Sequence, residues 1–255
     1  MFDLLKTRLH QGYRTSDFPK GEVHLPERFR GKPVLDPSRC QEGCSSCRDI
    51  CPTQAITLNP LKLDLGACLF CPLCQEKCPD KAIAFTSDYR LAVRSRNDLM
   101  VSGEELRLAS EMEDKMLRVF GRSLKLRQVC AGGCSGCEAE LAAAGNVIFD
   151  LSRFGIQFVA SPRHADGIVV TGPVTNNMET ALRKTYEAVP SPKIVIAVGA
   201  CAVSGGPFAG AEDSQDGVPK DIPVDLYIPG CPPHPLTILD GLLRLLGRLE
   251  EKGDS

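Results

Sequence analysis

The stretch CLFCPLCQEKCP, residues 68–79, decides how the first half of this chain folds. Its cysteines follow the spacing Cys-x2-Cys-x2-Cys-x3-Cys-Pro, which is typical of 4Fe–4S cluster ligation. Three thiolates two residues apart can bind three corners of a cubane from one loop, and Pro79 turns the chain so that Cys78 faces a different cluster. The alternative, a zinc site, usually pairs two Cys-x2-Cys knuckles across a longer gap. The spacing therefore predicts an iron–sulfur cluster.

A second copy of this motif, CQEGCSSCRDICP, occupies residues 40–52. It has one extra residue between its first two cysteines, which Gly43 can accommodate because glycine adopts turns that other residues avoid. The segment CRDICPTQAITL from Cys47 matches CQEKCPDKAIAF from Cys74, 27 residues further on. An internal repeat of this kind indicates a duplicated module.

The duplicated module, residues 40–95, resembles the bacterial two-cluster ferredoxins, a small α+β domain. In that family the last cysteine of each motif ligates the other motif's cluster. The resemblance implies that one 4Fe–4S cluster is held by Cys40, Cys44, Cys47 and Cys78. It implies that the other is held by Cys68, Cys71, Cys74 and Cys51. We expect the apolar segments Ala55–Leu58 and Ala82–Phe85 to be strands of a domain so small that its clusters must hold it together.

Residues 1–39 contain several prolines and scattered charges, and are therefore predicted to be an extended N-terminal arm. Four apolar residues near helical spacing begin it, namely Phe2, Leu4, Leu5 and Leu9. Two interpretations of this short amphipathic segment stay open. It is a surface helix packed on its own domain, or it docks on a partner or a membrane surface.

Residues 96–122 are predicted to be a helical linker. Ser102 and Glu105 have the spacing of a capping box, which favours a helix that begins there. An imperfect apolar stripe follows and extends to Phe120. Such a stripe is usually packed against a core, so we expect Ser102–Phe120 to rest on the next domain.

From about residue 123 to residue 255, strand-like and helix-like segments alternate, which predicts an α/β flavodoxin-like domain with a parallel sheet. Five apolar runs are typical of buried parallel strands: Leu124–Val129, Ile156–Ala160, Gly167–Val170, Ile194–Val198 and Val224–Ile228. Three segments between and after them have a helical pattern: Glu138–Phe149, Asn177–Val189 and Pro235–Glu251.

Cysteines follow three of these predicted strands, and the carboxyl ends of parallel strands meet at one edge, where ligands bind. We therefore expect a third 4Fe–4S cluster at this edge, held by Cys134, Cys137, Cys201 and Cys231. The glycines beside these cysteines let the backbone approach the cluster and donate N–H groups to its sulfurs. Zinc is the weaker alternative, because the thiolates come from three separate loops.

Three clusters would use twelve of the thirteen cysteines and leave Cys130. Cys130 is either a buried small apolar side chain or an alternative ligand or redox-sensitive thiol. Glu138 follows a cluster ligand, and it either tunes the cluster and relays protons or serves as an acidic residue favoured in the first turn of a helix. Arg163 and His164 are candidates for tuning the cluster's potential, although an exposed histidine is the simpler interpretation. We expect His234 at the surface.

The second half of the chain, from residue 125 to about 248, resembles the small electron-transfer subunit of membrane-bound, energy-converting nickel–iron hydrogenases of the formate hydrogenlyase type. This family is homologous to the 20-kDa subunit of respiratory complex I. The resemblance rests on the motifs GGCSGCE, SPRHAD, TGPVT, GACAVSGG and DLYIPGCPPHP. The first half resembles the polyferredoxin of the same complexes, to which FRGKP at residues 29–33 also fits. The chain therefore looks like a fusion of two adjacent subunits.

The resemblance implies an electron-transfer subunit of an oxidoreductase complex, not catalytic alone. Complex I has two adjacent cysteines where this chain has Cys134-Ser-Gly-Cys137, and this favours a hydrogenase over the nickel-free, quinone-type alternative. The implied partners are a large subunit, nickel–iron or a nickel-free homologue, and proton-pumping membrane subunits. A free ferredoxin-like carrier and a structural zinc protein are the alternatives from other classes.

Composition excludes several other functions. A net charge of −2 and 5% aromatic residues give no case for nucleic acid. The chain lacks a GxGxxG motif, a Walker loop and a Ser/Thr-rich phosphate loop, so we expect neither NAD nor FMN. The first residues show no signal peptide and no twin-arginine pair. With thirteen cysteines, we expect reduced thiols in the cytoplasm, in a complex peripheral on the inner face of the cell membrane.

Overall fold

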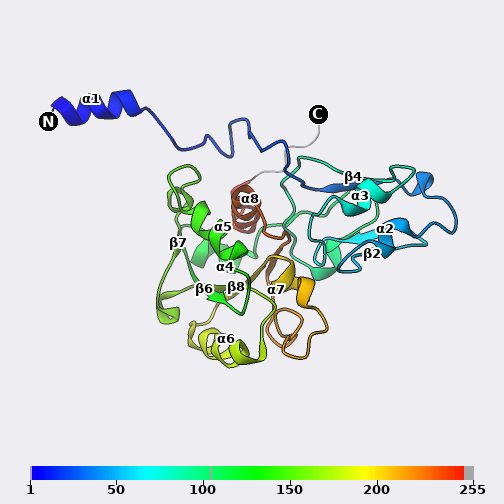
Figure 1. The fold of residues 1–255 in the computed structure, drawn as a ribbon. Coiled ribbons are helices and arrows are strands. Elements are labelled where there is room, and N and C mark those ends of the chain that lie inside the picture. Colours follow the sequence, from blue (N-terminus) through cyan, green and yellow to red (C-terminus); the bar gives the residue numbers. More distant parts are fainter. Residues whose placement is uncertain (1, 104, 250–255) are drawn as a thin grey trace.

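A five-stranded parallel sheet organises the second half of the chain in a computed structural model that describes residues 2–103 and 105–249 (Figure 1). The strand order is β10-β9-β8-β6-β7, which is the flavodoxin-like order 2-1-3-4-5 read from the other edge. The strands are β6 (Leu124–Cys130), β7 (Ile156–Phe158), β8 (Gly167–Thr171), β9 (Ile194–Val198) and β10 (Leu226–Ile228). The predicted fold class is therefore confirmed.

Helices cover both faces of this sheet, so β8 and β9 are buried along their whole length. On one face, Val169 and Ile196 pack in a core with α8; on the other, Val170 and Val195 pack in a core with α6. This alternation is the period of two that a strand imposes. The helices are α5 (Gly136–Ala144), α6 (Asn176–Ala188), α7 (Ala200–Ser204) and α8 (Pro235–Leu245), with short 3-10 turns η3 (Leu151–Phe154), η4 (Pro162–His164) and η5 (Gly206–Phe208).

Two predicted helices are shorter than the sequence indicates. The helix expected over Glu138–Phe149 is α5, which ends at Ala144. The helix expected over Pro235–Glu251 is α8, which ends at Leu245; Gly247 follows with a φ of +62°, a conformation that ends helices. Residues 250 and 251 of that prediction lie outside the described residues.

The first half of the chain forms a small α+β lobe, coloured blue to cyan in Figure 1. Its strands make a two-stranded and a three-stranded antiparallel sheet. They are β1 (Pro33–Leu35), β2 (Ile56–Thr57), β3 (Lys62–Asp64), β4 (Ile83–Phe85) and β5 (Met100–Val101). The short helices are α2 (Ser46–Asp49), α3 (Leu73–Lys77), η1 (Pro37–Arg39) and η2 (Arg96–Leu99). Because β1 and β5 belong to these sheets, strand pairing extends beyond the predicted bounds of residues 40–95.

The linker helix predicted from Ser102 was wrong over most of its length. A helix forms only at α4 (Asp114–Phe120), and none begins at the expected capping box; residue 104 lies outside the described residues. The physical reason is that backbone N–H groups of this segment donate to carbonyls distant in sequence and not to carbonyls within a helix. The N–H of Ala109 donates to the carbonyl of Ala92, and the N–H of Met112 donates to that of Leu245, so this segment runs extended between the lobes.

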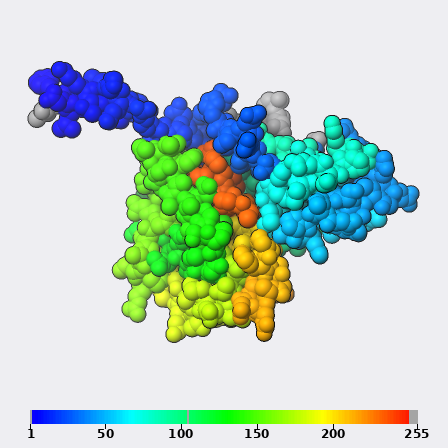
Figure 2. All heavy atoms as spheres, viewed as in Figure 1, coloured from blue at the N-terminus to red at the C-terminus, as the bar shows by residue number. Residues whose placement is uncertain are grey.

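The N-terminal helix α1 (Phe2–Gln11) buries no residue and projects away from the body (Figures 1 and 2). The expectation that it packs on its own domain is therefore wrong, because the arm after it makes the contacts instead. Phe18 is buried between the rings of Tyr89 and Phe154. Arg153 donates to the carbonyls of Ser16 and Phe18, at 2.8 Å each. None of the described helices is long and apolar enough to cross a bilayer.

The two lobes pack directly against each other (Figure 2). Val93 and Tyr227 exchange backbone hydrogen bonds across the boundary, at 3.0 and 2.9 Å. Ser204 Oγ donates to the carbonyl of Gly66 at 2.9 Å. A Cβ on Gly66 would lie 2.7 Å from Cγ1 of Val203, so only glycine permits this close approach.

Candidate metal centres

The structure brings Cys51 from the first motif to Cys68, Cys71 and Cys74 of the second. All four line one small, mostly apolar cavity. We call these four the second cysteine set. Burial is the main cause that raises the pKa of Cys68 to about 12, and burial with the neighbouring thiols raises that of Cys74 to about 11. Binding of a metal to these thiols therefore requires the release of their protons, which couples metal binding to folding and to pH.

The repeat is preserved in three dimensions at the last cysteine of each motif. Gln54 and Lys81 both have a φ of +51°, which turns the chain back toward the cysteine three residues earlier. The N–H of Ala55 then donates to Sγ of Cys51 at 3.3 Å, and that of Ala82 donates to Sγ of Cys78 at 3.2 Å. Hydrogen bonds to sulfur are one of the means by which a protein tunes a cluster's potential.

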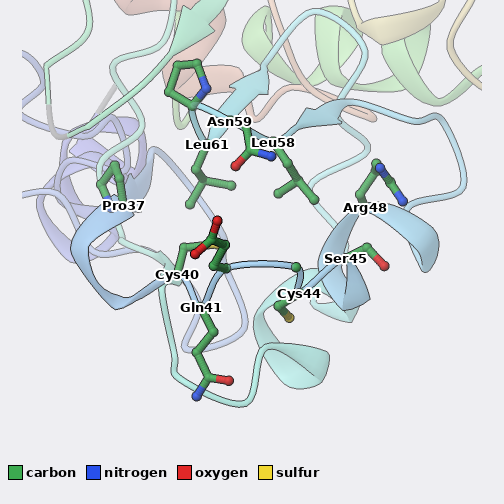
Figure 3. Close-up of a pocket in the computed structure, with 12 residues that line it drawn as sticks. Pro37, Cys40, Gln41, Cys44, Ser45, Arg48, Leu58, Asn59 and Leu61 are labelled. Atoms are coloured by element: carbon green, nitrogen blue, oxygen red, sulfur yellow. The ribbon is translucent and has the colours of Figure 1, made fainter.

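The first cysteine set, Cys40, Cys44, Cys47 and Cys78, is more open. Burial, followed by the neighbouring Cys78 and Cys40, raises the pKa of Cys47. Cys40 and Cys44 line a pocket of about 580 Å³, along its wall opposite Leu58 and Leu61 (Figure 3). Gly43 between them has a φ of +81°, as predicted for the inserted residue.

The third cysteine set, Cys134, Cys137, Cys201 and Cys231, comes together at the carboxyl edge of the parallel sheet. Burial is the largest cause that raises the pKa of Cys137, followed by Glu138 and then by the three other thiols of the set. Burial and the thiols of Cys231 and Cys134 raise the pKa of Cys201 to about 11. Cys134 and Cys231 are exposed, so this site opens onto the molecular surface.

Glycine sets how closely the backbone approaches the third cysteine set. Gly199 has a φ of +89°, and a Cβ there would lie 2.4 Å from Sγ of Cys137. A Cβ on Gly206, whose φ is +54°, would lie 3.1 Å from Sγ of Cys201. The two glycines therefore make room for the sulfurs and for whatever they bind.

Cys130 is exposed, so the expectation of a buried apolar side chain is wrong. It ends strand β6 at the sheet edge, and burial and then the neighbouring Glu138 raise its pKa. Burial alone would raise the pKa of Glu138, but the hydrogen bond from Thr171, with the nearby Cys130, holds it below its usual value. Glu138 is thus an ionised carboxylate next to the Cys137 ligand position.

Arg163 and His164 are exposed and lie on η4, before the start of β8. The first residue of β8, Gly167, pairs with Leu126, four residues before Cys130 on β6. At about 3.3 Å per residue, the beginning of β8 is about 13 Å from the edge that carries the third cysteine set. Among the described residues, neither side chain donates to a cysteine. The exposed position of His164 agrees with the simpler interpretation given above, and a tuning role for Arg163 and His164 stays a prediction.

His234 is half-buried, whereas the sequence analysis predicted that it lies at the surface. Its Nδ1 accepts a hydrogen bond from the N–H of Leu236 at 3.2 Å, which caps α8. Phe29 and Phe149 pack edge-on against the ring, with centroids 5.5 and 5.8 Å away. The residue pattern CPPHP gave no signal for this packing, since both aromatic partners are distant in sequence.

Sequence reasoning also missed the contact between the second and third cysteine sets. Burial, followed by the thiols of Cys134 and Cys71, raises the pKa of Cys231. Cys71 and Cys231 line the same pocket between the lobes. No short-range signal could have predicted this proximity, because it follows from how the two lobes pack against each other.

The donor chemistry fits three 4Fe–4S clusters, since each site offers four thiolates and little else. In the described part of the chain, no three Cys, His, Asp or Glu side chains converge closely enough to hold one metal ion. A cubane binds four thiolates through four separate irons, so its ligands need not converge in this way. Such clusters would supply one-electron transfer.

Comparison with known proteins matches residues 134–245 to the family described as NADH ubiquinone oxidoreductase, 20 Kd subunit. The chain is 44% identical over 143 residues to formate hydrogenlyase subunit 7 of Escherichia coli, covering 56% of each protein. It is 40% identical over 150 residues to the probable membrane-bound hydrogenase subunit mbhJ of Pyrococcus furiosus, covering 59% of this chain and 90% of that protein.

An NADH-quinone oxidoreductase subunit of Heliobacterium modesticaldum is 46% identical over 121 residues, which cover 47% of this chain and 69% of that protein. A chain in the structure of the membrane-bound sulfane sulfur reductase, an archaeal respiratory membrane complex, matches with a TM-score of 0.46 and 35% identity. That match covers 53% of this chain and 75% of the other. The family match and the sequence relatives confirm the resemblance inferred from the motifs of the second half.

Proposed function

Because this chain belongs to the family of the 20-kDa subunit of NADH–ubiquinone oxidoreductase, we propose that it is an iron–sulfur electron-transfer subunit of an energy-converting, nickel–iron hydrogenase of the formate hydrogenlyase type. Its relatives are named as subunits of hydrogenase and quinone oxidoreductase complexes, which supports an oxidoreductase role. The ferredoxin function of the first lobe rests on its two cysteine motifs, since the relatives above support only the second half.

The arrangement of the three cysteine sets in a row carries this proposal. Cys47 of the first set is among the thiols that raise the pKa of Cys74 in the second. Cys71 of the second set acts in the same way on Cys231 of the third. Three 4Fe–4S clusters bound at these sites would form one electron path from the outer end of the ferredoxin lobe to the carboxyl edge of the parallel sheet.

The exposed end of this path is where a partner would act. Cys134 and Cys231 are exposed, so the third cluster would face the surface and the active site of a large subunit. The spacing Cys134-Ser-Gly-Cys137 favours a nickel–iron partner. The alternative is the equivalent subunit of a nickel-free, quinone-type oxidoreductase, which the likeness to the NADH-quinone oxidoreductase of Heliobacterium modesticaldum supports.

We place this complex at the cytoplasmic face of the cell membrane, beside proton-pumping subunits. Helix α1 supports this, because Phe2, Leu5 and Leu9 share one of its faces and are exposed. At 100° per residue, Lys6 and Arg8 lie on either side of that face, as in helices that bind the surface of anionic membranes.

Purification of the tagged chain without oxygen, together with whatever co-elutes, tests this function. About one nickel per assembly, with hydrogen evolution from a reduced donor, is the expected result. A full complement of iron without nickel would move the function to the quinone-type alternative. A monomer that co-elutes with nothing would instead indicate a free carrier.

A further inference from the structure

A cationic pocket lies between the N-terminal arm and helix α8, and none of the three cysteine sets lines it. Its volume is about 570 Å³, within the range of small-molecule sites. The arm contributes Phe18–Gly21, and the segment before β5 contributes Tyr89 and Arg90. The remaining wall comes from α8 and the residues after it, namely Asp240, Arg244, Arg248 and Leu249.

Arg244 is the central cation of this pocket. It is 8% exposed, and its Nε donates to Oδ2 of Asp240, which is 2% exposed, at 2.9 Å. Among the described residues, no side chain or carbonyl accepts a hydrogen bond from its two terminal amino groups. In the described part of the chain these terminal nitrogens are not among the fully buried atoms that lack a partner, so their N–H groups remain accessible to an anion that enters the pocket.

The charge of the pocket is positive. Of its four cationic side chains, Arg90 is neutralised by a bidentate pair with Asp88, at 2.8 and 2.9 Å. Arg248 donates to the carbonyls of Phe154 and Gly121 and keeps its charge. Lys20 has no ion-pair partner among the described residues. Asp240 is the one carboxylate among the described residues that line the pocket, and it is already paired with Arg244.

We propose that this pocket binds a phosphate-bearing anion, with Arg244 and Lys20 as its ligands. A guanidinium presents parallel N–H groups that match two phosphate oxygens, and the ammonium of Lys20 adds a point charge. The Tyr89 hydroxyl is a further donor at the wall. Phe18 and Leu249 form an apolar side that suits the organic part of a phosphate ester.

The bound phosphate would fasten the arm to α8, because Lys20 belongs to the arm and Arg244 to the helix. No step of electron transfer uses this pocket, so the inference is independent of the proposed function. A soluble phosphate ester and a phospholipid headgroup share the recognised chemistry, and experiment can separate them.

Two probes applied to the full, cluster-loaded chain test the proposal. Inorganic pyrophosphate is titrated by calorimetry, and vesicles of phosphatidylglycerol in phosphatidylcholine are used in flotation. Lys20→Ala removes an exposed charge. Arg244→Lys keeps a cation beside Asp240 but removes the parallel N–H groups of the guanidinium. Lys184→Ala, on helix α6 away from the pocket, is the matched control.

Saturable pyrophosphate binding that weakens by about tenfold in Lys20→Ala and Arg244→Lys, but not in Lys184→Ala, would support a soluble phosphate ester. The same pattern confined to the vesicles would support a phospholipid headgroup. Absence of saturable binding to both probes, or binding that neither pocket variant weakens, would overturn the proposal.

Discussion

At the residue scale, the geometry of the third cysteine set depends on glycine positions where a larger side chain would not fit. Gly199 combines a left-handed φ with a location where a Cβ would strike Sγ of Cys137. The sequence motif GACAVSGG predicts that glycines stand beside the ligand. Which glycine meets which sulfur is set by the packing of two loops, and so could not be read from the motif.

We expect Gly199→Ala to abolish the third cluster while leaving the two ferredoxin clusters intact. The added Cβ would displace the Cys137 sulfur, 2.4 Å away, from its ligand position. Iron analysis with electron paramagnetic resonance measures this as a loss of about four irons per chain. Gly210→Ala is the control, since its φ of +77° is also positive but nothing lies within 4 Å of a Cβ there. It should cost about 1 kcal/mol of stability and no iron. Equal iron loss in both variants would contradict the argument.

Cys51 and Cys130 differ in whether the structure places them with a cysteine set. Cys51 belongs to the first motif in sequence but lines the cavity of the second set, whereas Cys130 is exposed and outside all three sets. Cys51→Ala should therefore disturb the paramagnetic signal of the cluster bound by Cys68, Cys71 and Cys74. Cys130→Ala should preserve all signals. An essential Cys130 beside a dispensable Cys51 would refute the assignment.

At the element scale, the strands of the parallel sheet could be predicted because burial on both faces leaves continuous apolar runs such as Ile194–Val198. The extended course of residues 105–113 could not, because its backbone donors bind Ala92 and Leu245, which are distant in sequence. The capping-box spacing at Ser102 favoured a helix, but the long-range hydrogen bonds of this segment stabilise a non-helical course instead. Helix α1 was predictable as a helix, but its lack of packing was not.

Helix α1 is expected to bind the membrane surface. Leu5→Glu with Leu9→Glu places charge on its apolar face and should greatly reduce binding to anionic vesicles in flotation. Thr7→Glu with Gln11→Glu adds the same charge on the opposite face and should reduce binding much less. Neither pair should change the iron content, because α1 buries no residue. Similar losses in both pairs would indicate that charge alone, and not the apolar face, governs binding.

The cap of helix α8 is expected to make stability depend on pH. Burial lowers the pKa of His234 from its ordinary 6.5. As the pH falls below about 6.5 the unfolded chain therefore binds the proton first, and the free energy of unfolding decreases until the pH reaches the folded-state pKa, where it levels off. His234→Asn keeps a capping acceptor without this titration. Denaturant unfolding at pH 7 and pH 5.5 should show a loss larger by about 1 kcal/mol in the unsubstituted chain. An identical loss in the variant would refute this role.

At the scale of the whole molecule, the two lobes place three cysteine sets in one row. The sequence predicts each set from motif spacing and strand topology, because ligand spacing is local and strand ends share an edge. The order of the sets and the approach of Cys71 to Cys231 depend on the packing of the lobes. That packing relies on scattered contacts such as Ser204 with Gly66, which leave no pattern in the sequence.

The most direct test of the account is the iron content and spectrum of the chain purified without oxygen. We predict about twelve irons and twelve acid-labile sulfides per chain, with three distinguishable 4Fe–4S signals in electron paramagnetic resonance during reductive titration. Zinc in place of iron, or about eight irons with the third cysteine set vacant, would contradict the claim that this molecule carries electrons through three clusters.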